Sequence, residues 1–88
     1  METTDNFDLR NFQLNRDLLQ HVPLELMFRY NFVPLEETSD GRLAIAVADP
    51  NQLLMIDEIS ALLHRRIMTK RSSLRQIEAL LKKTEQGR

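Results

Sequence analysis

The stretch from Leu43 to Pro50, which reads Leu-Ala-Ile-Ala-Val-Ala-Asp-Pro, constrains the fold more than any other part of the chain. Its first six residues carry no charge; two of them are β-branched and three are alanine. This composition is typical of a strand with both faces covered, because small side chains let a helix approach closely. We predict that residues 43–47 form the central, buried strand of a sheet, which indicates a core and no particular function.

The residues beside this strand predict a turn before it and a helix after it. Asp40-Gly41 can make a hairpin turn, since glycine adopts positive φ at little cost. Asp49 can cap a helix that begins at residue 50 or 51, with Gln52 placed as in a capping box. The segment therefore predicts a turn, a buried strand and a capped helix in succession.

Apolar residues at helical spacing predict four helices. They are residues 14–22 with Asn15 as a possible cap, a helix from Pro23 that Asn31 ends, residues 50–63, and a last helix after Ser73, where Ser73 and Gln76 match a capping box. The third helix is expected to turn Leu53, Ile56, Ile59 and Leu63 inward, and the last to turn Leu74, Ile77 and Leu81 inward.

Two further segments read as strands, residues 32–38 and residues 67–71. Pro34 cannot donate a hydrogen bond to a ladder, so the first of them is expected at an edge of the sheet. The second follows a helix, which implies a parallel relation to the central strand. The predicted fold is α+β: a small three-stranded sheet, made of a β-hairpin and one strand after a crossover helix, packed with about four helices.

The overall composition predicts one small domain in a reducing compartment. The chain has 88 residues, no cysteine, and an acidic, polar start that is unlike a signal peptide. Its apolar runs are far shorter than the ~20 residues that cross a bilayer. These features favour the cytoplasm.

The net charge of −1 conceals an uneven distribution along the chain. Residues 1–63 carry four Lys/Arg and eleven Asp/Glu, a net charge of −7, whereas residues 64–88 carry eight and two, a net charge of +6. A segregated charge can steer a partner or dock against another domain, and it can equally be a solvated helix face.

The first twelve residues contain large apolar side chains with no core of their own. Phe7, Leu9 and Phe12 could pack on the domain as an arm, or they could stay exposed as a contact for a partner. Both interpretations remain open from the sequence.

The sequence lacks the patterns of common catalytic, metal and nucleic-acid sites. Its two glycines cannot form a P-loop or a dinucleotide fingerprint. His21 and His64 have no neighbour at metal-ligand spacing, and Asp57-Glu58 point in different directions on a helix. All five aromatic residues precede residue 33, away from the basic end, so no stacking platform accompanies the cations. We expect no catalysis, no metal site and no nucleic-acid partner.

Residues 22–81 resemble the N-terminal domain of type II secretion and type IV pilus assembly ATPases. The matching residues are Val22-Pro23-Leu24 with the helix through Phe28 and Tyr30, Phe32-Val33-Pro34-Leu35, the run from Gly41 to Pro50, and Ile56-Asp57-Glu58-Ile59. The chain departs from the family at His64-Arg65-Arg66, where a glycine is common.

The resemblance implies a non-catalytic adaptor that tethers a hexameric motor to the cytoplasmic domain of an inner-membrane assembly protein. Residues 1–13 would be an arm, 14–85 the adaptor domain and 86–88 the start of a linker. No cofactor is expected in this chain; ATP and Mg would belong to the motor domain, itself a partner, and the membrane would be met only indirectly, at its cytoplasmic face. The first candidates for the partner contact are Phe7, Leu9, Phe12 and Leu14.

Two alternatives remain beside this adaptor role. One is a regulatory domain that binds an anionic nucleotide such as a cyclic dinucleotide, held by Arg65, Arg66, Lys70 and Arg71. Some members of the family bind cyclic di-GMP through paired R-L-G-x-x-L motifs, and residues 6–20 contain none, so the resemblance gives this alternative no support. The other is an intramolecular spacer that packs on the motor.

Overall fold

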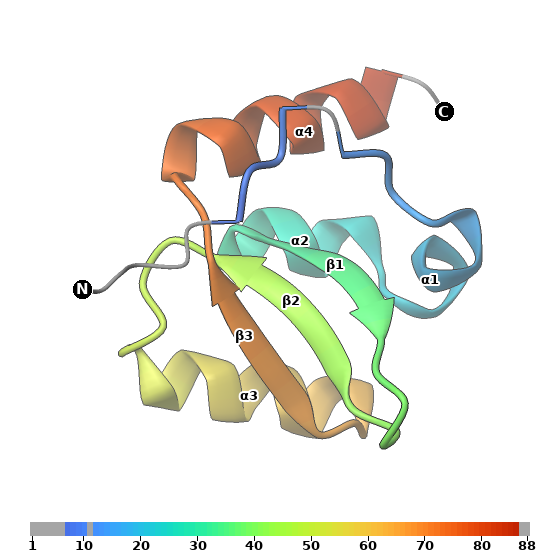
Figure 1. Cartoon of the computed structure of the whole chain (residues 1–88), viewed down its shortest axis with the longest axis vertical. Helices are drawn as coiled ribbons and strands as arrows, with labels where there is room; N and C mark the ends of the chain where they lie inside the picture. The colour runs from blue at the N-terminus through green and yellow to red at the C-terminus, as the bar shows by residue number, and fades with distance from the viewer. Residues whose placement is uncertain (1–6, 11, 87–88) are drawn as a thin grey trace.

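The computed structural model describes residues 7–10 and 12–86, which form an α+β fold of four helices and a three-stranded sheet (Figure 1). The helices are α1 (Arg16–His21), α2 (Leu24–Tyr30), α3 (Leu53–Leu63) and α4 (Leu74–Gln86). The strands are β1 (Phe32–Glu37), β2 (Leu43–Val47) and β3 (Ile67–Arg71). The fold class predicted from the sequence is confirmed.

The alanine-rich strand β2 lies at the centre of the sheet, as predicted. The strand order is β1-β2-β3, with β1 antiparallel and β3 parallel to β2. All five residues of β2 are buried. Gly41 takes a φ of 87° in the hairpin turn, which a side chain would disfavour. The hairpin and the crossover strand are therefore both present.

The outer strand β1 carries two features that interrupt regular pairing. Pro34 lies within it, and the register with β2 shifts between Pro34 and Glu36. A proline offers no N–H to a ladder and a bulge twists a strand, so both suit an edge position. The prediction that this segment is an edge strand is confirmed.

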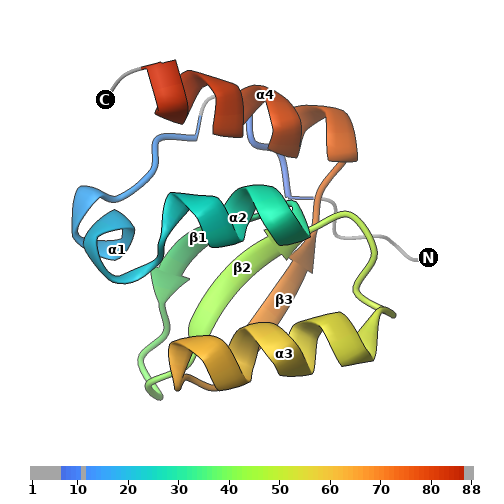
Figure 2. The ribbon, with the colours of Figure 1, turned by 180° about the vertical axis from the view of Figure 1, so that it is seen from behind.

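Helices cover the sheet and continue the core beyond it. Helices α2 and α3 lie on the same side of the strands, behind them in Figure 1 and in front of them in Figure 2. Helix α4 packs against β1, β2 and α2, whereas α3 packs against β3. The core includes side chains from α1, α2, α3, α4, β1 and β2, and one residue from before the first helix, Leu9.

Polar side chains and left-handed residues fix several helix ends where the sequence predicted them. The Asn15 side chain accepts a hydrogen bond from Asp17 N–H at 2.8 Å and caps α1. Asn31 ends α2 in the left-handed region, with a φ of 55°. His64 ends α3 in the same conformation, with a φ of 56°.

The predicted start of the third helix was wrong. Asp49 Oδ1 accepts from Asn51 N–H at 3.0 Å, and the Asp49 carbonyl accepts from Gln52 N–H at 3.2 Å. These bonds close a local turn instead of capping a helix, because an aspartate side chain can also bond the backbone two residues on. Helix α3 therefore begins at Leu53, and Gln52 precedes it without a side-chain cap.

Two predicted inward side chains are exposed. Leu53 is 67% exposed and Leu74 is 44% exposed, and each is the first residue of its helix. Side chains on a helix tilt toward its N-terminus, so a first residue projects past the part that packs on the sheet. Ile59, Ile77 and Leu81 are buried as predicted.

Within the described residues, no helix is long and apolar enough to cross a membrane.

Candidate functional site

The arm segment, which comprises residues 7–10 and 12–14, is tied to the junction between β3 and α4. Phe7 N–H donates to the Arg71 carbonyl at 2.6 Å, and Ser72 Oγ donates to the Phe7 carbonyl at 2.7 Å. Leu9 N–H donates to Gln76 Oε1 at 3.0 Å. Ser72 is 2% exposed, so its hydroxyl needs such a partner. These bonds join the start of the chain to its last strand and last helix.

The side chain of Gln76 accepts a hydrogen bond from the arm segment instead of capping its own helix. Ser73 Oγ accepts from Gln76 N–H at 3.0 Å, which is one half of the capping box that the sequence predicted. In a complete box the Gln76 side chain would accept from Ser73 N–H. Here its carboxamide oxygen accepts from Leu9 N–H, a residue 67 positions away in the sequence. The helix start thereby becomes an attachment point for the arm segment.

The apolar residues of the arm segment differ in how deeply they are buried. Leu9 is 3% exposed and belongs to the core. Phe7 and Phe12 are half-buried and meet edge to face, with ring centroids 5.6 Å apart and an interplanar angle of 78°. Leu14 is half-buried as well. A partner could therefore reach parts of Phe7, Phe12 and Leu14, and the contact role of all four residues stays a prediction.

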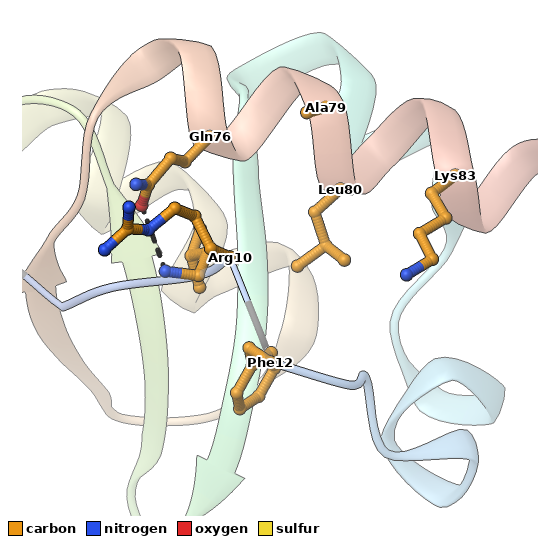
Figure 3. A pocket seen from close by; sticks show the side chains of 7 residues that line it. Arg10, Phe12, Gln76, Ala79, Leu80 and Lys83 are labelled. Carbon is orange, nitrogen blue, oxygen red and sulfur yellow. Dashed lines mark hydrogen bonds between the residues drawn. The ribbon is translucent and has the colours of Figure 1, made fainter.

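The arm segment and α4 enclose a small groove of about 220 Å³ (Figure 3). Leu9, Arg10 and Phe12 line it from the arm segment, and Gln76, Ala79, Leu80 and Lys83 line it from α4. Arg10 lies at the Gln76 end of the groove and Lys83 lies at the other end (Figure 3). This arm–α4 groove combines an apolar wall with two cationic side chains.

The charge of Arg10 is paired locally. Its guanidinium donates to both carboxylate oxygens of Asp8, with the shortest contact 2.8 Å from Nη2 to Oδ2. Hydrogen bonds from Arg10 lower the pKa of Asp8 to about 2. Lys83 makes no ion pair with any residue in the described part of the chain. Lys83 is therefore the cation that the groove can offer to an acidic group.

The four residues of the predicted anion site are distributed along β3 and the two residues before it. Arg65 pairs with Glu37 and also donates to the Gly41 carbonyl, beside the hairpin turn. Arg65 and Arg66 precede β3, whereas Lys70 and Arg71 end it. At about 3.3 Å per residue, Arg66 and Lys70 are roughly 13 Å apart along the backbone. Arg66 and Arg71 are exposed, and the role of the set in binding an anion stays a prediction.

No metal centre is suggested by the side chains that the structure places. Within residues 7–10 and 12–86, no three or more His, Cys, Asp or Glu side chains gather as they would around an ion.

The domain boundaries predicted at residues 13 and 85 stay predictions. Residues 1–6 of the predicted arm and residues 87–88 of the predicted linker lie outside the described residues.

Sequence reasoning missed the residues that attach the arm segment. The sequence assigns Ser72 no role, and it predicts Gln76 as the second member of a capping box. The only available signal was indirect. Three large apolar residues precede the first helix, and they needed an apolar surface to pack against. Nothing in the sequence indicated that α4 would supply that surface.

Comparisons with known proteins identify related chains. The family model of the MshEN domain matches residues 3–88. None of the curated proteins matches the sequence. A solved structure of MshE with cdg superposes with a TM-score of 0.76 at 17% identity, covering 91% of this chain and 58% of that one. The solved N-terminal domain of XpsE superposes with a TM-score of 0.69 at 19% identity, covering 90% of this chain and 55% of that one.

These identities are low, so the two structures show a shared fold. The chain spans somewhat more than half of the length of either solved relative.

Proposed function

This chain belongs to the MshEN domain family, and on that premise we propose that it is a non-catalytic docking domain of a type II secretion or type IV pilus assembly ATPase. In this role it tethers the motor to the cytoplasmic domain of an inner-membrane assembly protein, at the cytoplasmic face of that membrane. ATP and Mg act in the motor domain, which is the second partner of the docking domain.

The observation that carries the proposal is the arm–α4 groove. Interfaces draw most of their binding energy from a few large side chains in small pockets, surrounded by a polar rim. The groove has an apolar wall that includes Phe12 and Leu80, and Lys83 stands at one end. It fits an apolar anchor of the partner that is followed by a carboxylate.

The test is a calorimetric titration of the full chain with the cytoplasmic part of the membrane protein. We expect Phe12→Ala to weaken binding by about tenfold or more, since removing a large side chain from the wall that contacts the partner's anchor should cost at least about 1.4 kcal/mol. Phe28→Ala is the matched control, because Phe28 is 37% exposed on α2 and does not line the arm–α4 groove. Lys83→Gln should weaken binding less, and this effect should shrink at high salt.

Two results would count against the docking proposal. The first is an absence of binding by the unaltered chain at tens of micromolar. The second is an equal loss of affinity for Phe12→Ala and Phe28→Ala, which would remove the groove from the interface.

A second candidate function is the binding of a cyclic dinucleotide. The observation that favours it is the structure of MshE with cdg, a relative that shares the fold. Calorimetry of the full chain with cyclic di-GMP tests it, with Arg65→Ala and Arg66→Ala as the variants. A saturable signal that both variants remove would favour nucleotide binding, and a flat titration would count against it.

A further inference from the structure

The outer edge of β3 presents backbone groups to the surroundings. Leu43 N–H donates to the Arg66 carbonyl at 2.8 Å, and Ser72 N–H donates to the Val47 carbonyl at 2.9 Å. In a parallel pair, alternate residues of a strand turn their N–H and C=O groups toward the neighbour. These two bonds therefore direct the peptide groups of residues 66, 68, 70 and 72 toward β2. The groups of Ile67, Thr69 and Arg71 point away from the sheet.

One of these outward groups already receives a backbone donor. The Arg71 carbonyl accepts from Phe7 N–H at 2.6 Å. Among residues 7–10 and 12–86, no backbone group bonds the outward N–H and C=O groups of Ile67 and Thr69. Among the residues that the structure describes, the edge is thus occupied at its last residue, and the preceding outward groups have no backbone partner.

The two edges of the sheet differ in their protection. Natural sheets block exposed edges with proline, bulges or charged side chains, because open edges attract other strands. The β1 edge carries Pro34 and a bulge. The β3 edge has a regular register with β2 along all five residues and contains no proline, so its protection comes from the charged side chains of Lys70 and Arg71. It is the edge on which an added strand would meet no backbone obstacle.

The charge around this edge selects what can occupy it. Residues 64–75 contain five cationic residues and no acidic residue; Arg65 pairs with Glu37, and the other four cations are Arg66, Lys70, Arg71 and Arg75. A second copy pairing through β3 would bring two such sets together, and like charges on neighbouring strands are unfavourable. An extended segment that carries Asp or Glu would instead be attracted.

We propose that the β3 edge binds an extended acidic segment of a partner protein, which adds to the sheet as a fourth strand. The segment exchanges hydrogen bonds with Ile67 and Thr69, and its carboxylates face Arg66, Lys70 and Arg71. This surface is separate from the arm–α4 groove, so the inference holds whether or not the groove docks a partner.

Amide hydrogen exchange of the free full chain is the first test. We expect the Ile67 and Thr69 amides to exchange at least about tenfold faster than those of Met68 and Lys70, which bond β2. Equal protection of all four amides would overturn the proposal, because the edge would then be covered. Sedimentation of the same sample would show whether a second copy or the chain's own residues 1–6 cover it.

Peptide binding is the second test, with a short fluorescein-labelled peptide of alternating valine and glutamate as the probe. We expect fluorescence anisotropy to show saturable binding, slowed exchange at Ile67 and Thr69, and no binding of the same peptide with every backbone nitrogen methylated. A peptide of valine and lysine should bind at least about tenfold more weakly. Equal binding of the methylated and unmethylated peptides would overturn the proposal.

A pair of variants at one position separates backbone pairing from side-chain contact. Thr69→Pro removes an outward N–H without removing a bond to β2, and we expect it to weaken binding by about tenfold. Thr69→Val keeps that N–H and should bind within about twofold of the unaltered chain. If Thr69→Pro does not fold, the exchange pattern and the methylated peptide still decide. Equal affinities for the two folded variants would contradict strand addition.

Discussion

Replacing Leu9 with alanine tests whether the arm segment is part of the folded core. Leu9 is 3% exposed, although it lies in a segment without helix or strand and precedes α1. If the arm segment is packed in solution as it is in the structure, this side chain stabilises the domain as a core residue does.

The expected loss in the free energy of unfolding follows from the burial of Leu9. The substitution removes about three carbon groups, each worth about 0.8 kcal/mol when buried, or about 2.4 kcal/mol in total. A rigid cavity would raise the cost toward about 5 kcal/mol. Leu9 lines an open groove, so its neighbours and water can fill part of the space, and we expect about 2–3 kcal/mol. A domain of this size has about 4–13 kcal/mol of stability in all.

Urea unfolding of the full chain, followed by circular dichroism, measures this loss. Leu54→Ala is the matched control, because Leu54 is 86% exposed on α3 and the same atoms are removed. We expect the control to change the free energy of unfolding by less than about 0.5 kcal/mol. If Leu9→Ala costs no more than Leu54→Ala, the arm segment is not packed on α4, and the arm–α4 groove does not exist as described.

Three further predictions address single interactions. Gln76→Ala should cost about 1 kcal/mol in urea unfolding and speed amide exchange at Leu9, because it removes the acceptor of Leu9 N–H. The Asp8 carboxylate should titrate near a pKa of about 2 in carboxyl NMR, and Arg10→Gln should return that pKa toward 3.8. The stabilising effect of this depressed pKa is complete above pH 3.8 and is lost as the pH falls through about 2. His64→Gly should raise the free energy of unfolding by about 0.5–1 kcal/mol, because glycine adopts the φ of 56° without strain. A thermal melt should therefore show a slightly higher melting temperature.

Local signals in the sequence were sufficient where a few neighbouring residues decide the structure. The alanine-rich run predicted β2, Pro34 predicted an edge strand, and Asn31 predicted the left-handed end of α2. Each of these depends on the conformational preference of one residue or on side chains within a few positions. The predicted partner and anion residues have no such local determinant, and their roles stay predictions.

The misjudged features depend on choices that local preference does not settle. Asp49 can cap a helix or close a turn, and both uses need the same side chain followed by free N–H groups. Gln76 can complete a capping box or accept from a distant amide, and the fold decides between them. The position of Leu9 depends on residues at the other end of the chain, so no short window of sequence contains it.

The attachment of the arm segment also sets an order of assembly during synthesis. The ribosome makes Phe7 and Leu9 before their acceptors on Arg71 and Gln76, which follow more than sixty residues later. Closing so long a loop costs entropy before any contact can compensate for it. The β1–β2 hairpin and the β2–α3–β3 unit can therefore form first on the emerging chain. The arm segment then attaches to β3 and α4 last. Until then its aromatic side chains are available to chaperones.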